Sequence, residues 1–429
     1  MTSTTSTTAR IAIDAQRFDA RVKRRRLADL RLRIYGIVAI CFAIGMLGTL
    51  LVTLGFGASR ALVQTHVTVD FPISPENVDA ADLQRSDWRA VVRAGVSALL
   101  PPAESTADER EMAAIVTSNA QFFVRDAVAR NPSIIGGTLT LAVPVSDPYD
   151  QLQKSIIQRA TPEANRRLDD RAIGWFENLV AQGRVSTPIN WALVFNPNSR
   201  FPEIAGLQGA IVGSFYALLV CFFISFPVGI AAAIYLEEFA PKNRITAIIE
   251  VNINNLAAVP SIVFGLLGLA VFIQFFGLPR SAPLVGGMVL SLLTLPTIII
   301  VTRAALKAVP PSIREAALGM GASRHQMIMH HVLPLAVPGI LTGTIIGLAH
   351  ALGETAPLLL IGMNAFMTDA PGGIMDAATA LPTQIYIWAD SPERGFVART
   401  SAGILVLLAF LLVMNGVAIY LRQRLESRT

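Results

Sequence analysis

The sequence predicts an all-α polytopic membrane protein with six transmembrane helices and an inserted α+β extracytoplasmic domain. Mean hydropathy is +0.53 and only 15% of residues are charged, whereas soluble domains average roughly 25%. A long polar segment, 57–206, interrupts the apolar pattern early in the chain. Crossing a bilayer takes about 20 apolar residues, and six stretches meet that length: 34–56, 207–236, 254–276, 284–304, 336–361 and 401–421.

The N-terminal arm, residues 1–33, is strongly basic. Nine of the 35 Lys and Arg residues lie in it, five of them between Arg21 and Arg26. Such an arm can bind nucleic acid, but an apolar run of about 22 residues follows it, which favours a cytoplasmic anchor ahead of a membrane helix. That run is longer than a signal-peptide core and no A-x-A-like site follows it, so we expect it to be retained. We therefore expect membrane lipid, and no nucleic acid, as its partner.

Short-loop charges set the orientation. The basic arm places the N-terminus in the cytoplasm, and six crossings return the tail, 422–429, to the same side. The loop 305–335 also falls inside, and it carries Arg314 and Arg324. Both termini are therefore predicted to be cytoplasmic.

The segment 57–206 holds 14 basic and 17 acidic residues, and a segment of this length is translocated regardless of its charge. Its patterns predict helices from Asp87, over 108–129 and over 165–180, and a strand over 138–143. No catalytic or metal-ligand spacing occurs in it. Cys41 and Cys221 lie in apolar runs, which argues against a disulfide or metal site, and three loop histidines are expected to be solvated: His325, His330 and His331.

The loop 305–335, which we call the protruding loop, has clear helix signals. Pro310 and Pro311 stop any preceding helix. Ser312 with Glu315 fits a capping box, Gly321 suits a left-handed helix end, and Ser323 with Gln326 fits a second capping box. A break or kink is expected around Pro334. The loop should form two short helices joined by a glycine turn.

This loop resembles the EAA signature of ABC importer permeases in Glu315-Ala316-Ala317, Gly321 and Leu333-Pro334. His331 departs from it, because the family usually has Ile or Val there. The resemblance implies that the loop docks on a separate ATPase dimer, through Arg314, Glu315, Ala316, Ala317 and Gly321. The chain itself lacks a G-x-x-x-x-G-K-[ST] nucleotide loop, so we expect no catalytic residue and no directly bound cofactor, with ATP used by the partner.

Polar residues interrupt the fifth apolar stretch. His350 and Glu354 are spaced i, i+4 and share one helical face, Thr355 follows, and Pro357 should kink the helix. Ionisable residues at membrane depth usually face a pathway or a partner. Pro227, Pro260 and Pro296 predict further kinks. The alternative is that the prolines are ordinary kinks and Glu354 is a structural hydrogen-bond partner.

The segment 353–359, GETAPLL, resembles a motif of PstA-type phosphate permeases, as do 260–266 and 295–297. The resemblance covers about 207–421. It implies the inner-membrane permease of an ATP-driven phosphate importer in a bacterial plasma membrane, with His350, Glu354 and Thr355 lining the pathway. It also implies a PstC-type second permease and a periplasmic phosphate-binding protein as partners. Related permeases often carry Arg where this chain has His350, so pathway charge here depends on imidazole protonation.

Three alternatives remain open from the sequence. The chain could be a permease of the same class for molybdate, sulfate or another solute. It could be a membrane-anchored sensor that binds a ligand through residues 57–206. It could also be a proton-driven transporter that works without an ATPase partner.

Overall fold

The computed structural model describes residues 4–79 and 82–426, with side chains from Arg26 onward except at 27, 421 and 425–426. Arg428 of the predicted tail and Arg21 to Arg25 of the predicted arm therefore lie outside the described side chains. The chain divides into two compact units, Met1–Phe56 and Gly57–Thr429.

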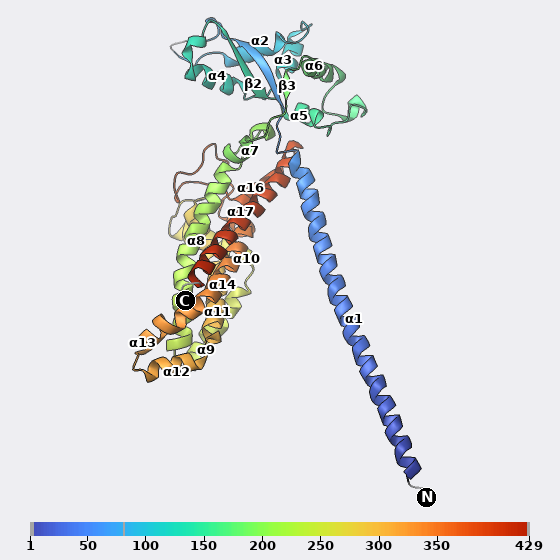
Figure 1. Cartoon of the computed structure of the whole chain (residues 1–429). Helices are drawn as coiled ribbons and strands as arrows, with labels where there is room; N and C mark the ends of the chain where they lie inside the picture. Colours follow the sequence, from blue (N-terminus) through green and yellow to red (C-terminus); the bar gives the residue numbers. More distant parts are fainter. Residues whose placement is uncertain (1–3, 80–81, 427–429) are drawn as a thin grey trace. The chain divides into compact units, whose positions relative to one another are not determined.

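The first unit consists of helix α1, Thr4–Ser59, which runs three residues into the second unit (Figure 1). The helix shows no interruption at residue 33, where the predicted arm meets the predicted crossing. Its part Ala28–Ser59 is long and apolar enough to span a membrane.

Residues 57–206, the segment for which we keep the name inserted domain, contain a three-stranded antiparallel sheet in the order β2-β1-β3. Strand β1 is His66–Pro72, β2 is Thr138–Pro144 and β3 is Val185–Ser186. In β1 the alternate residues Val67, Val69 and Phe71 are buried, so one face of the strand packs on the core. The sequence analysis predicted only β2, although this alternation is a usable signal for β1.

Helices cover the buried face of this sheet, and α2 and α4 contact β1 and β2 respectively. Their core joins residues from the strands and helices, including Phe71, Val91, Val124 and Phe176. The helices of this domain are α2 Trp88–Ser97, α3 Thr106–Ala113, α4 Ala120–Arg130, α5 Asp147–Gln153, α6 Asp170–Ala181 and α7 Ala192–Phe195.

Two helix predictions in this domain were wrong in their bounds. The helix predicted over 108–129 is split into α3 and α4, because the intervening Thr117 donates its N–H to the Pro144 carbonyl at 2.9 Å and Val116 bridges to Val145. The helix predicted from 165 begins at Asp170, where the Asp169 carboxylate accepts from the Ala172 N–H at 2.7 Å. A contact with β2 and the residue after it therefore separates α3 from α4, and the Asp169 cap sets the start of α6.

The membrane domain, residues 207–426, is helical. Its α-helices are α8 Gln208–Ile234, α9 Arg244–Ala257, α10 Ser261–Leu267, α11 Pro283–Ala308, α12 Pro311–Gly319, α13 Arg324–Met327, α14 Leu333–Gly353, α15 Ala356–Leu360, α16 Leu381–Ala389 and α17 Gly395–Glu426. Three π-helical segments extend or join them: Tyr235–Phe239, Gly268–Phe275 and Ile328–Val332.

The described residues hold five helices that are long and apolar enough to cross a membrane. The third predicted crossing, 254–276, is instead part of a pair bent by 101°, Arg244–Ala257 with Ser261–Phe275. The total is six only if this bent pair counts as one span. Helix α11 packs against both α8 and α14 (Figure 1), and its Val289, Leu290 and Ile298 are buried.

Candidate functional site

The protruding loop forms two short helices, α12 and α13, joined by a turn at Gly321. Gly321 has φ +86°, in the left-handed region that only glycine enters without strain. The capping box predicted at the second helix is confirmed: the Ser323 hydroxyl accepts from the Gln326 N–H at 3.2 Å, and the Ser323 N–H donates to Gln326 Oε1 at 2.9 Å. The loop is therefore held in one shape by its own local bonds.

One expectation for this loop was wrong. Ser312 and Glu315 do not form a capping box, because α12 begins at Pro311 with Pro310 as its N-cap, so Ser312 already lies inside the helix. Around Pro334 the helix continues from Arg324 to Gly353 without a break. The distortion expected there takes the form of the π-helical segment Ile328–Val332, which ends two residues before Pro334.

The EAA residues divide between an inner and an outer face of α12. Ala317 is 3% exposed and packs in a cluster with Leu306, Met327 and Ile328. Glu315 and Ala316 are exposed on the outer face. Met320, at the end of the helix, is 82% exposed. The inner alanine anchors the loop and the outer side chains remain available for contact.

Arg314 bonds within the chain. Its guanidinium donates to the Val309 and Leu306 carbonyls at 2.7 and 2.8 Å, which lie at the C-terminal end of α11, and to Glu238 Oε1 at 2.9 Å. Glu238 lies in the π-helical segment that ends α8, and its side chain is only 9% exposed. Arg314 thus ties the protruding loop to two long helices.

A second charged cluster, which the sequence analysis missed, lies on the same helices. Arg303 of α11 pairs with Glu250 of α9 at 2.6 Å and with Glu237 at 3.3 Å, and Lys307 lies 3.5 Å from Glu237. The i, i+4 spacing of Arg303 and Lys307 after an apolar helix was a weak signal for it. The cluster joins α8, α9 and α11 next to the protruding loop.

The fifth apolar stretch is broken rather than kinked. Helix α14 ends at Gly353, Glu354 takes an extended backbone conformation (φ −73°, ψ 119°), and α15 begins at Ala356. The expected kink at Pro357 is therefore displaced to Glu354 and Thr355, and Pro357 lies in the first turn of α15, where proline is tolerated. The break leaves backbone groups of Glu354 and Thr355 outside both helices.

His350 and Glu354 meet at this break. Their Nε2 and Oε1 atoms lie 3.2 Å apart, and the two side chains are 66% and 16% exposed. The structure therefore brings together two of the predicted pathway residues, with Thr355 beside them in sequence at the start of α15.

Two of the segments that resemble PstA motifs, 260–266 and 353–359, are in contact. Gly265 of α10 lies against Pro357 of α15, so closely that a Cβ at this position would be 2.7 Å from the Pro357 Cα. Pro260 is the N-cap of α10, at the 101° bend. Pro227 and Pro296, by contrast, lie inside the continuous helices α8 and α11. The segments 260–266 and 353–359 thus form one packed element beside the break.

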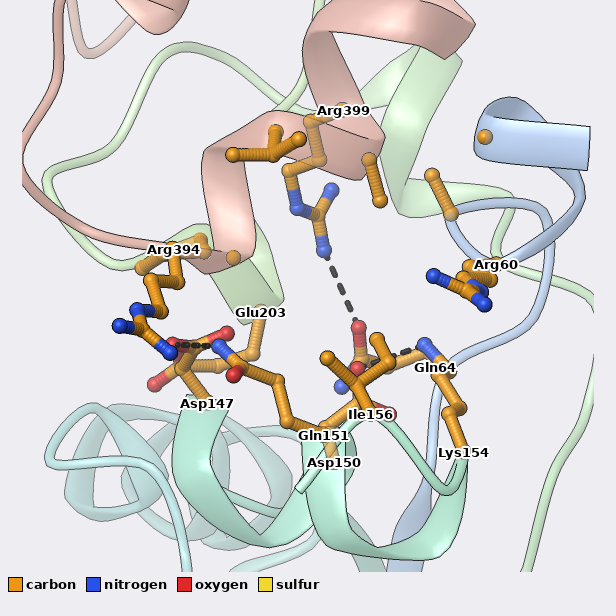
Figure 2. A pocket seen from close by; sticks show the side chains of 16 residues that line it. Arg60, Gln64, Asp147, Asp150, Gln151, Lys154, Ile156, Glu203, Arg394 and Arg399 are labelled. Carbon is orange, nitrogen blue, oxygen red and sulfur yellow. Dashed lines mark hydrogen bonds and ion pairs between the residues drawn. The ribbon is translucent and has the colours of Figure 1, made fainter. Parts of the chain in front are cut away.

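A cavity of about 310 Å³, with charged and amide side chains among apolar ones on its walls, lies where the inserted domain meets the start of α17 (Figure 2). Its walls carry Arg399, Gln64, Gln151, Asp147 and Glu203. Burial raises the pKa of Asp147 and of Glu203. The sequence analysis missed this site, and the only sequence signal was the run of acidic and basic residues at Asp147, Asp150 and Lys154.

Comparisons with known proteins match two family models to different parts of the chain. The family model described as "Binding-protein-dependent transport system inner membrane component" matches residues 225–427, and a "Domain of unknown function (DUF3333)" matches residues 19–163. The first match contains the protruding loop and the broken helix, and the second contains most of α1 and the first part of the inserted domain.

Individual relatives match about half of the chain. The "Phosphate transport system permease protein PstA" of Yersinia pestis is 35% identical over 215 residues, 50% of this chain and 71% of that protein. The "Probable ABC transporter permease protein YqgI" of Bacillus subtilis is 28% identical over 265 residues, 58% of this chain and 88% of that protein. A structure of the inward-facing MetNI methionine ABC transporter aligns with a TM-score of 0.38 at 18% identity, over 51% of this chain and 94% of that chain. The chain belongs to the PstA-type ABC transporter permeases, the binding-protein-dependent inner-membrane components, and carries an additional N-terminal domain.

Proposed function

We propose that this chain is the inner-membrane permease subunit of an ATP-driven phosphate importer. The observation that carries the proposal is the break at Glu354, where a carboxylate and an imidazole lie 3.2 Å apart at the end of the long apolar helix α14. Relatives of 31 to 35% identity are phosphate permeases by name. Broken helices with polar groups at their ends are the usual form of transport sites in membranes.

The pair at the break suits a partly protonated oxyanion. The Glu354 carboxylate accepts a hydrogen bond from a phosphate O–H, and a protonated His350 donates to a phosphate oxygen and supplies positive charge. In the absence of substrate, the His350 and Glu354 side chains form a polar contact with each other. An arriving phosphate exchanges their mutual contact for two contacts of its own.

Coupling runs through the protruding loop. A partner ATPase dimer binds and hydrolyses ATP, and its closure moves α12 through the exposed face that carries Glu315, Ala316 and Met320. Because Arg314 bonds to the ends of both α8 and α11, a displacement of α12 is transmitted directly into two membrane helices. Gly321 keeps the loop rigid enough to transmit it.

The complete transporter contains a PstC-type second permease, the ATPase dimer and a periplasmic phosphate-binding protein. In the bacterial inner membrane both termini and the protruding loop face the cytoplasm. The inserted domain then faces the opposite side. This arrangement places the basic loop charges inside, as the positive-inside rule requires.

The test is uptake of radiolabelled phosphate by proteoliposomes that contain the chain with its partner subunits. Uptake should require ATP, and arsenate, which has the same shape and charge, should compete, whereas sulfate and molybdate should not. Glu354→Gln should reduce uptake by about tenfold or more, the scale of a lost charged hydrogen bond. The matched control is Asp369→Asn, an exposed carboxylate outside the helices.

ATP-independent uptake, or uptake of sulfate in place of phosphate, contradicts the proposal. If Glu354→Gln takes up phosphate at the wild-type rate, Glu354 does not contribute to the translocation pathway.

A further inference from the structure

The cavity at the start of α17 is built from segments far apart in the sequence. Its walls come from the loop after α1, from α5 of the inserted domain, from the turn Pro202–Ile204 and from the first residues of α17 (Figure 2). It has about 310 Å³ of space, ample for a small polar ligand. The protruding loop and the break at Glu354 contribute nothing to it.

Arg399 is a buried cation on this cavity. It is 4% exposed, and its guanidinium donates to two neutral oxygens, the Ala205 carbonyl at 2.7 Å and Gln64 Oε1 at 3.1 Å. Within the described part of the chain it forms no ion pair. A guanidinium has five N–H donors, and a buried charge without a direct counter-ion is strongly disfavoured. The carboxylates of Asp150, Glu203 and Asp147 act on it electrostatically without forming an ion pair, and its guanidinium keeps N–H donors for an anion in the cavity.

Two buried amide atoms on the cavity walls also have no hydrogen-bond partner among the residues that the structure describes. They are Gln64 Nε2 and Gln151 Oε1, in side chains that are 2% and 3% exposed. In each of the two amide groups, the hydrogen bond of the second polar atom fixes the orientation of the group. Gln64 Oε1 accepts from Arg399, and Gln151 Nε2 donates to Asp147 Oδ2 at 2.6 Å. One wall therefore offers donors, and the other offers an acceptor.

The charges of the lining favour an anion that also has a proton to donate. Four cations, Arg60, Lys154, Arg394 and Arg399, face three carboxylates, Asp147, Asp150 and Glu203, a formal balance of 4 − 3 = +1. Lys154 and Asp150 neutralise each other at 2.6 Å. Asp147 is paired with Arg167 at 3.5 Å and also accepts from Gln151. Among the described residues, the lining cations that form no ion pair are Arg399 and the exposed Arg60 and Arg394, and the one lining carboxylate without an ion pair is Glu203.

We propose that this cavity binds a small, partly protonated oxyanion of the inorganic phosphate class, at a site separate from the translocation pathway. Arg399 and the Gln64 amide donate to its oxygens, and its O–H donates to Gln151 Oε1. Sulfate, which carries no proton at neutral pH, leaves Gln151 Oε1 unsatisfied and is rejected. The choice of phosphate as ligand rests on the proposed function, whereas the donor and acceptor pattern does not.

Binding there has a structural consequence. The Asp147 carboxylate lies against Gly395, the first residue of α17, where a Cβ would collide with it. A negative group at this end of a helix is stabilising. A ligand held by Gln64, Gln151 and Arg399 therefore fixes the inserted domain to the start of a membrane helix.

Local protection of an introduced cysteine tests the site without reference to transport. In the full-length chain with Cys41→Ser and Cys221→Ala, Ile156→Cys places a thiol on the cavity wall, at a position that is 37% exposed. Millimolar phosphate should slow maleimide labelling of this thiol by about fivefold or more, and sulfate at the same ionic strength should not. Gln64→Leu and Gln151→Leu should each weaken phosphate protection by about tenfold, the scale of one lost buried hydrogen bond.

The matched control is Gln153→Leu, an exposed residue of the same helix α5 that does not line the cavity, which should keep full protection. Equal protection by sulfate, absence of protection by millimolar phosphate, or protection that survives both leucine variants each overturns the proposal. Glu354→Gln should lose uptake and retain protection. A chain that is protected by phosphate but does not transport it disproves the proposed function alone.

Discussion

Arg314 and Glu238 lie 2.9 Å apart although 76 residues separate them in the chain. The arginine belongs to the first helix of the protruding loop, and the glutamate belongs to the π-helical end of α8. The same guanidinium holds two carbonyls at the end of α11. One side chain therefore connects the loop that we expect to meet the ATPase with two helices of the membrane domain.

Arg314→Ala should uncouple the transporter. The variant leaves the largely buried Glu238 without its cation and the Leu306 and Val309 carbonyls without a donor, a loss of about 3 kcal/mol or more. Arg314→Lys should recover only part of the function, because an ammonium group cannot reproduce a planar guanidinium fork. ATP-driven phosphate uptake and its coupled ATPase activity are the measurements. Arg324→Ala, an exposed residue of the same loop, is the control, and wild-type coupling by Arg314→Ala would refute the link.

Gly321→Val should abolish uptake and ATPase coupling while the protein still inserts into the membrane. A β-branched side chain at φ +86° forces the turn between α12 and α13 to rearrange. Gly319→Val provides a matched comparison two residues away, since Gly319 has an ordinary helical φ and open space around its Cβ position. Membrane insertion is measured by fractionation and coupling by ATPase activity. Equal activity of the two variants would show that the left-handed turn is dispensable.

Gly265→Ala should lower the thermal unfolding midpoint of the purified protein. The added Cβ would lie 2.7 Å from the Pro357 Cα and 2.9 Å from Leu360 Cδ1, so α10 and α15 must move apart, at a cost of about 1–3 kcal/mol. Gly347→Ala on α14 is the control, because its Cβ would meet only ordinary contacts at 3.9 to 4.0 Å. An unchanged midpoint for Gly265→Ala would mean that the two motif segments are not packed as described.

His350→Gln should flatten the pH dependence of phosphate uptake. Glutamine carries no charge at any pH, whereas histidine can gain a proton as pH falls, so we expect uptake by the wild-type protein to weaken from about pH 6 to about pH 8. His350→Arg should keep uptake high across that range, since arginine stays charged. The measurement is the initial uptake rate at fixed phosphate. A glutamine variant with the wild-type profile rules out His350 as the source of the pathway charge.

The stability of Glu203→Gln should fall less than that of the wild-type protein as pH rises. Burial raises the pKa of Glu203 in the folded chain, with a hydrogen bond to Thr117 acting in the opposite direction. The folded state then holds this proton to a higher pH than the unfolded state does. Stability therefore falls as pH rises from the ordinary glutamate value through the raised one.

Thermal unfolding midpoints from about pH 4 to about pH 8 provide the measurement for Glu203. The variant should show a shallower decline, and Glu104→Gln, an exposed carboxylate of the same domain, should follow the wild-type curve. An identical decline in Glu203→Gln and wild type would contradict the burial effect.

Much of the candidate site could be predicted because its signals are local. The turn at Gly321 and the Ser323 cap depend on residues within one helical turn, and the pairing of His350 with Glu354 follows from helical spacing. The apolar stretches likewise predict the long helices from length and composition alone. The error in the predicted helix start at Ser312 also has a local cause. Proline is favoured at the first position of a helix, so the helix begins at Pro311 and Ser312 lies inside it.

By itself, the sequence determined the helical membrane class, the shape of the protruding loop and the polar interruption of the fifth apolar stretch. Tertiary structure alone decided the split of α3 from α4, the link from Arg314 to Glu238 and the cavity in which Gln64 meets Arg399 across 335 residues. The physical reason is that periodicity and capping are set by neighbours along the chain. Buried charges and amides, in contrast, find partners only after distant segments have packed, and no spacing rule records which segments those are.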